Sequence, residues 1–169
     1  MKPLLIVDGY NVIGAWDEAE RGQWTLDECR DRLQQQLEEY SGYSGEEIVL
    51  VFDGYQSGRR LSTEESYGAL TLVFTRHGET ADSYIERLVA STPRYRQVRV
   101  ATSDGLEQSQ ILSTGATRLT SRELLVEMRQ ARQSGMDAHK AQNAGRKKRS
   151  IASRLGDETL AALEKMRRG

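Results

Sequence analysis

Cysteine is almost absent from this sequence, and histidine is scarce. Cys29 is the single cysteine, which excludes an intramolecular disulfide and a metal centre built from several thiolates. The two histidines, His77 and His139, have no partner at a metal-ligand spacing, so a histidine-centred metal site is not expected. A chain without disulfides fits a reducing compartment, and we expect a cytoplasmic protein.

Long apolar runs are also missing. No run approaches the roughly 20 residues that cross a bilayer, and the apolar start from Leu4 to Val7 is broken at once by Asp8. We therefore expect no signal peptide, no membrane anchor and no membrane partner. With 169 residues, 37% of them hydrophobic and 29% charged, the chain can bury a core of one globular domain with a short appendage.

The net charge of −1 conceals a strong asymmetry. From His139 onward the chain carries nine basic and three acidic residues, a net charge of +6, which leaves −7 for the remainder. A basic tail provides the cations that phosphate contacts require, although many solvated tails have the same composition. We predict RNA contacts at two arginines in a polar loop and at a basic run in the tail: Arg59, Arg60, Arg146, Lys147, Lys148 and Arg149. Simple solubility explains the loop arginines equally well.

Short apolar runs recur between helical patterns. The run 4–7 predicts a strand buried on both faces, as in parallel sheets, the runs 48–52, 70–74 and 98–101 predict further strands, and 115–119 fits a short edge strand. Helices are predicted from Thr25 to about Tyr40, from Thr80 to a point before Pro93, from Asp104 to Leu112, and from the capping box of Thr120 and Glu123. Residues 55–68 are polar and contain glycine, which predicts a mobile loop.

This alternation predicts an α/β fold, a three-layer sandwich with a mostly parallel central sheet. We expect the compact domain to span residues 1–135. Residues 136–169 are predicted to form a basic linker and a C-terminal helix, because the composition becomes polar and basic after Gly135.

Four aspartates follow predicted strands or begin predicted helices. Asp8 and Asp53 each follow an apolar run and precede a glycine, whereas Asp82 and Asp104 lie near helix starts. In a parallel sheet all four converge on the edge where ligands bind. Crowded carboxylates repel each other unless a hard cation such as Mg²⁺ or Mn²⁺ neutralises them. Taken singly, Asp53 reads as a turn and Asp82 and Asp104 as favourable helix-start charges; the joint pattern favours a metal site.

Other polar residues lie close to these aspartates in the sequence. Asn11 follows Asp8 and offers an uncharged oxygen suited to a metal-bound water or a phosphate, although capping a turn explains it comparably well. Glu79 and Glu86 flank Asp82, and we expect both to face solvent.

Four sequence blocks carry a resemblance to a known family. "LLIVDGYNVIGAW", "IVLVFDGY", "VFTRHGETADSYIERL" and "VRVATSDGLEQ", in this order, closely resemble the YacP-like branch of the NYN-domain nucleases, from about Leu4 to about Met128. The resemblance implies a PIN-like fold and a metal-dependent endoribonuclease of bacterial mRNA processing or decay, including cleavage on ribosomes. It marks Asp8, Asn11, Asp82 and Asp104 as the metal-centred site, with Asp53 at the margin.

Three hypotheses follow. The first is cleavage of single-stranded RNA by water activated by Mg²⁺ or Mn²⁺, with Asp8, Asp82 and Asp104 as principal ligands. The second is a non-catalytic module that binds RNA or the ribosome, because the charge is so strongly segregated. The third is an aspartyl-nucleophile phosphatase, which is disfavoured because Tyr10 stands where that chemistry needs a second acid.

Overall fold

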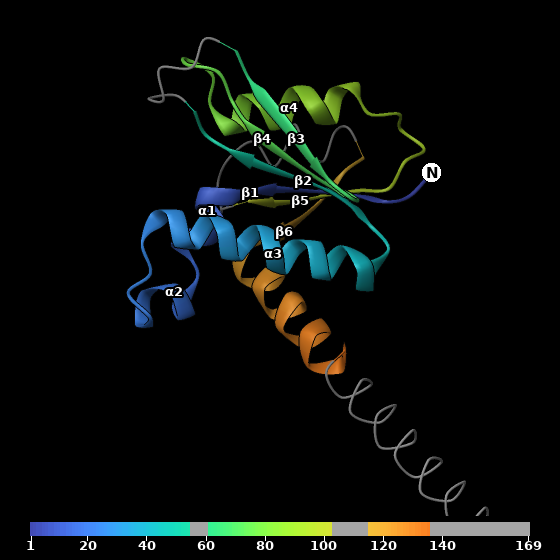
Figure 1. Ribbon diagram of the computed structural model, residues 1–169. Coiled ribbons are helices and arrows are strands. Elements are labelled where there is room, and N and C mark those ends of the chain that lie inside the picture. The colour runs from blue at the N-terminus through green and yellow to red at the C-terminus, as the bar shows by residue number, and fades with distance from the viewer. Residues whose placement is uncertain (55–60, 103–114, 136–169) are drawn as a thin grey trace, which may run out of the picture. The chain divides into compact units, whose positions relative to one another are not determined.

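The computed structural model describes residues 1–54, 61–102 and 115–135, and these form an α/β sandwich around a six-stranded sheet (Figure 1). The strands are β1 (Leu4–Asp8), β2 (Glu47–Phe52), β3 (Thr63–Tyr67), β4 (Leu70–Phe74), β5 (Val98–Thr102) and β6 (Thr117–Thr120). They lie in the order β3-β4-β2-β1-β5-β6, and every neighbouring pair is parallel except β3 with β4. The predicted mostly parallel sheet is confirmed.

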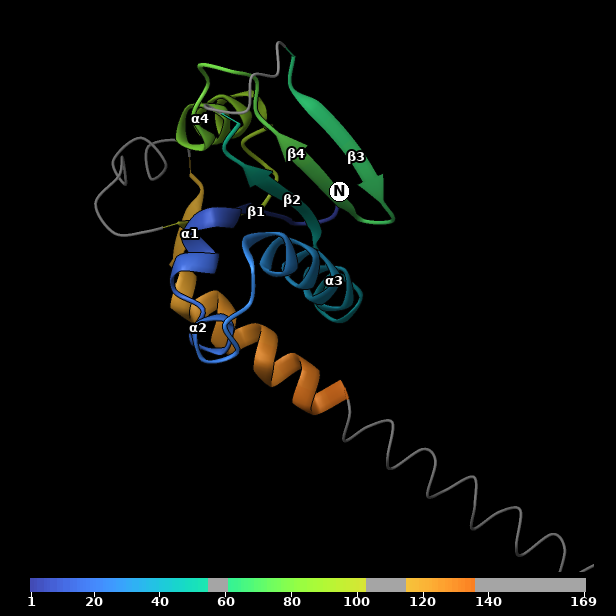
Figure 2. The same ribbon diagram turned by 60° about the vertical axis from the view of Figure 1, so that its left-hand side comes forward.

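Helices cover both faces of the sheet (Figures 1 and 2). The labelled helices are α1 (Gly9–Gly14), α2 (Asp17–Arg21), α3 (Leu26–Ser44) and α4 (Ala81–Ser91), and a further helix spans 121–135. Side chains of α1, α2, α3 and the first part of helix 121–135 share one core cluster with β1 and β2. Side chains of α4 form the second cluster, on the opposite face. The three-layer arrangement is therefore confirmed.

The apolar runs are continuous because their strands are buried on both faces. Leu5 and Val7 of β1 enter the first cluster, whereas Leu4 and Ile6 enter the second. Cys29 lies in the first cluster, on the apolar side of α3. In the described part of the chain, no helix combines the length and the apolar character that a membrane crossing requires.

The chain divides into two compact units, Met1–Ala131 and Arg132–Gly169. The fold described above belongs to the first unit. The predicted basic linker and C-terminal helix, residues 136–169, lie outside the described residues. The predicted helix from Asp104 to Leu112 does so as well.

Two parts of the fold differ from the predictions. Residues 63–67, predicted as part of a mobile loop, form β3, an exposed strand that turns into β4 through Gly68 at a φ of 62°. Their acidic, exposed side chains lack the alternation that marks a strand, because β3 is an edge strand. Helix α3 also continues beyond Tyr40 to Ser44 and ends at Gly45, whose φ of 73° requires a glycine-like conformation.

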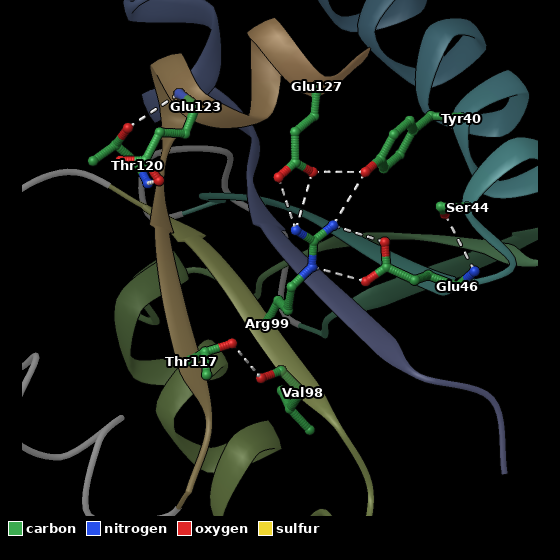
Figure 3. A network of polar contacts seen from close by, with 9 residues as sticks. All are labelled: Tyr40, Ser44, Glu46, Val98, Arg99, Thr117, Thr120, Glu123 and Glu127. Atoms are coloured by element: carbon green, nitrogen blue, oxygen red, sulfur yellow. Dashed lines mark hydrogen bonds and ion pairs between the residues drawn. The ribbon is translucent and has the colours of Figure 1, made fainter. Parts of the chain in front are cut away.

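A polar network joins α3, β5, helix 121–135 and Glu46, the residue before β2 (Figure 3). The Arg99 guanidinium of β5 donates to both carboxylate oxygens of Glu46, at 2.8 and 3.0 Å, and to both oxygens of Glu127 in helix 121–135, at 3.0 and 3.1 Å. It also donates to the hydroxyl of Tyr40 in α3, which in turn donates to Glu127. Burial and the Glu127 contact raise the pKa of Tyr40 to about 12, so this hydroxyl stays protonated.

We expect Arg99→Met to lower the free energy of unfolding by about 2 kcal/mol, because the buried carboxylate of Glu46 would lose its guanidinium partner. The expected loss is smaller than the full penalty of burying a charge, because the side chains of Arg99 and Glu127 are 29% and 39% exposed. Urea unfolding checks this value. The control is Arg96→Met, which removes an ion pair to the half-exposed Glu47 and should change stability less. Equal losses in both variants would contradict the prediction.

Candidate active site

Three of the four predicted aspartates meet at the carboxyl edge of the sheet. Asp8 is the last residue of β1 and pairs in register with Val51 of β2. Asp53 directly follows the last residue of β2, and Asp82 lies in the first turn of α4. Asp104 lies outside the described residues. Parallel strand ends bring the first two together, and the N-terminal turn of α4 adds the third.

The raised pKa values of Asp8 and Asp82 indicate electrostatic repulsion among the carboxylates at this edge. The pKa of Asp8 is raised from 3.8 to about 6, chiefly by burial and then by the charges of Asp82 and Asp53. The backbone amide of Asn11 opposes this rise, although its alignment falls short of a capping hydrogen bond. Burial, followed by the charge of Asp53, also raises the pKa of Asp82. Raised carboxylate pKa values in a polar cluster are typical of functional sites.

The donor atoms suit a hard divalent cation. Mg²⁺ is commonly held by one or two carboxylates, while water and phosphate oxygens complete its coordination. Across residues 1–54, 61–102 and 115–135, no three Asp, Glu, His or Cys side chains lie close enough to enclose an ion. Asp8 and Asp82 fit such an ion by their chemistry and by their mutual repulsion, which a cation relieves.

Thr75 joins the loop that begins at Asp53 to the loop that leads into α4 and Asp82. Its buried hydroxyl accepts from the amide of Gly54 at 2.7 Å and donates to the carbonyl of Glu79 at 2.7 Å. Its own amide donates to the carbonyl of Phe52. The loop after β2 is therefore tied to the loop before α4. Sequence reasoning missed this residue, because a threonine that follows a strand has no local signature for such a role.

Glu79 is buried, which corrects the expectation that it faces solvent. It is only 8% exposed and forms ion pairs with Arg76 at 3.2 Å and with Arg87 at 2.8 Å. The contact with Arg87 lacks the alignment of a hydrogen bond. Two arginines around one carboxylate permit this burial, and they brace the entry into α4 beside Asp82.

The turn from β1 into α1 is tightly packed. A Cβ at Gly9 would lie 2.3 Å from a ring carbon of Phe52, so only glycine fits. Phe52 is itself held between the rings of Tyr10 and Phe74, with centroid distances of 4.9 and 5.4 Å. The Tyr10 hydroxyl accepts from Arg30 of α3. This packing sets the direction in which the chain leaves Asp8.

Asn11, in α1, is the fourth described member of the predicted site. Its Oδ1 atom accepts a hydrogen bond of 2.6 Å from the hydroxyl of Ser121, which is 4% exposed. Sequence reasoning did not select Ser121. The remaining predicted residues lie outside the described residues: Asp104, Arg59, Arg60, Arg146, Lys147, Lys148 and Arg149.

Comparison with known proteins places this chain in a family. Residues 5–168 match the YacP-like NYN domain, which is nearly the whole chain. The chain belongs to the YacP-like NYN family. It is 35% identical to the protein YacP of Bacillus subtilis (strain 168), and the match covers 98% of this chain and 97% of YacP.

Solved structures agree with this membership. The crystal structure of Rae1 (YacP) from Bacillus subtilis matches with a TM-score of 0.68 and 34% identity, over 100% of this chain and 96% of that one. The crystal structure of a mutant of Rae1, in which leucine replaces one tryptophan, matches with a TM-score of 0.64 and 38% identity, over 78% and 77% of the two chains. The fold is thus PIN-like, and the family indicates an RNA-related nuclease, a class that generally uses divalent metal ions.

Proposed function

We propose that this protein is a metal-dependent endoribonuclease that cleaves single-stranded RNA. The observation that carries the proposal is the convergence of Asp8, Asp53 and Asp82 at the carboxyl edge of an NYN-type sheet, where the charge of Asp53 contributes to the raised pKa values of Asp8 and Asp82. Asp8, Asp82 and Asp104 are the proposed ligands of Mg²⁺ or Mn²⁺, and Asp53 has a secondary role. When bound, the ion would activate a water and stabilise charge on the phosphodiester.

The chain's own residues supply the rest of the site. The Thr75 hydrogen bonds tie the loop that begins at Asp53 to the loop that leads into α4, which supports the positions of the Asp53 and Asp82 carboxylates. Below pH 6 the Asp8 carboxylate becomes protonated, and its affinity for a cation should fall.

We extend the proposal to the cell. The substrate would be mRNA, in processing or decay, in the cytoplasm, and the ribosome is a proposed partner. Residues 1–135 would form the catalytic domain, and the basic residues of 136–169 would add affinity for RNA, together with Arg59 and Arg60. The charge separation between body and tail supports this division of labour.

The test is cleavage of a fluorescent single-stranded RNA in the presence of Mg²⁺ or Mn²⁺. Asp8→Asn and Asp82→Asn should each lower the rate by at least about a thousandfold, because each removes a charge that holds the ion. Asp31→Asn is the control, since Asp31 is an exposed aspartate on α3. Cleavage that persists in a clean preparation of Asp8→Asn would refute the proposal.

The charge asymmetry also favours a second candidate, a module that binds RNA or the ribosome without cutting. Glutamine in place of Arg146, Lys147, Lys148 and Arg149, in the full chain, separates the two. If binding weakens while a short RNA is still cut, the body is an enzyme and the tail a docking device. If the wild-type protein cuts no RNA with any divalent ion, the binding module is correct.

A further inference from the structure

The side-chain amide of Asn11 is held by a single hydrogen bond, and this bond determines which of its two polar atoms is committed. The hydroxyl of Ser121 donates to Oδ1 of Asn11 at 2.6 Å. Within the described residues, the Asn11 side chain makes no other hydrogen bond, and it is partly exposed. This bond turns the oxygen toward Ser121 and uses one of its two lone pairs, whereas neither N–H donor of Nδ2 has a partner among the described residues.

Ser121 is a rigid platform for this contact. Strand β6 pairs in parallel with β5, with Thr120 opposite Thr102, so residue 121 emerges at the same carboxyl edge as Asp8. A capping box starts the helix: Glu123 donates its amide to the Thr120 hydroxyl at 3.1 Å, and its carboxylate accepts from the Thr120 amide. Since Ser121 is also 4% exposed, its hydroxyl has little freedom to turn elsewhere.

The chemistry of the free atoms points to an anion. An amide NH₂ group donates hydrogen bonds and cannot bind a cation, whereas a phosphate oxygen accepts them. Asn11 lies three residues after Asp8, and its backbone amide already acts on the Asp8 carboxylate. The side chain is thus placed where a phosphodiester held beside Asp8 would present an oxygen.

We propose that Ser121 is a positioning residue that orients the Asn11 amide, so that its N–H donors contact a phosphate oxygen of the RNA and its oxygen does not bind the metal. This inference rests on the proposed function and deepens it. It also differs from the expectation that Asn11 acts through an oxygen. Ser121 acts only through Asn11, which makes the effects of the two residues dependent on each other.

A double-mutant cycle tests the dependence. Ser121→Ala and Asn11→Ala should each lower kcat for RNA cleavage by roughly tenfold, and the double variant should lose no more than Asn11→Ala alone. Ser121→Thr keeps the hydroxyl and should restore most of the rate. The matched control is Ser41→Ala: Ser41 is 6% exposed and donates to the carbonyl of Glu46 at 2.7 Å, at the opposite edge of the sheet. Ser41→Ala should lower the free energy of unfolding without changing kcat. If the double variant of Ser121 and Asn11 lowers kcat by the product of the two single effects, the proposal is wrong.

Two binding measurements separate a phosphate contact from a metal contact. In EDTA, where the proposed cleavage cannot run, Ser121→Ala and Asn11→Ala should weaken binding of a short single-stranded RNA by roughly fivefold to tenfold, again without adding to each other. The affinity for Mn²⁺, measured without RNA, should stay within about twofold of wild type. If Asn11→Ala weakens Mn²⁺ binding while RNA affinity is unchanged, Asn11 is a metal ligand and the proposal is wrong.

The same data distinguish the failure of this inference from the failure of the proposed function. A wild-type protein that binds RNA but never cleaves it, with losses of affinity that do not add, refutes the endoribonuclease and supports the role of Ser121. A wild-type protein that cleaves RNA, with a Ser121→Ala variant as active as wild type, supports the endoribonuclease and refutes the role of Ser121.

Discussion

Asp8→Asn is expected to stabilise the protein while it abolishes RNA cleavage. The folded protein raises the pKa of Asp8 from 3.8 to about 6, chiefly by burial, so the charged carboxylate is less favourable in the folded state than in the unfolded chain. Below pH 3.8 the group is protonated in both states, and no stability is lost. As the pH rises through 6, the folded protein bears the full penalty of the charge.

A change in pKa of this size corresponds to about 3 kcal/mol, and because Asp8 is partly exposed we expect a gain of about 1 to 3 kcal/mol for Asp8→Asn above pH 7. Urea unfolding in EDTA at low and high pH measures it; the gain should vanish near pH 4. Added Mg²⁺ should stabilise the wild type alone, so that the wild type becomes more stable than Asp8→Asn. Asp31→Asn is the control, and an Asp8→Asn variant less stable than wild type at pH 8 would contradict the prediction.

Gly9→Ala is expected to cause the largest loss of stability, about 3 kcal/mol or more. The added Cβ would lie 2.3 Å from the Phe52 ring, and that ring cannot move away because it is 1% exposed and packed between Tyr10 and Phe74. The chain must therefore shift where β1 enters α1. Asp8 and Asn11 lie on either side of this point, so cleavage should fall together with stability.

A second substitution tests the cause of that loss. Phe52→Leu removes the ring carbons nearest to Gly9, so the double variant with Gly9→Ala should be more stable than the sum of the two single losses. Gly14→Ala is the matched control, because a Cβ at Gly14 meets nothing within 4 Å. Purely additive losses from Gly9→Ala and Phe52→Leu, measured by urea unfolding, would show that the Phe52 contact is not responsible.

The sheet could be predicted from the sequence because its inner strands are buried on both faces. The runs that became β1, β2, β4 and β5 are mostly apolar, with Thr71 and Arg99 as the polar exceptions, and this pattern needs no knowledge of distant contacts. The capping boxes of α3 and helix 121–135 are equally local, since each joins residues three positions apart. Strand β3 was not predicted because it is held as a strand by its pairing with β4, and its own side chains show no strand pattern.

The candidate site could be predicted only in part, for a similar reason. Asp8, Asp53 and Asp82 follow from strand ends and a helix start, which the sequence reveals. The burial of Glu79 depends on Arg76 and Arg87 reaching it from both sides, and the role of Thr75 depends on a bond across two loops. Such contacts form only in the assembled fold, so no residue spacing in the sequence predicts them.

The central position of β1 in the sheet has a consequence for folding during synthesis. Leu4 pairs with Val98, and Asn11 receives its hydrogen bond from a residue 110 positions later. Asp8 is therefore synthesised early, yet strand β5 beside β1 and the hydroxyl that bonds to Asn11 are synthesised only late. We expect the site around Asp8 and Asn11 to stay incomplete in a nascent chain until synthesis has passed residue 121.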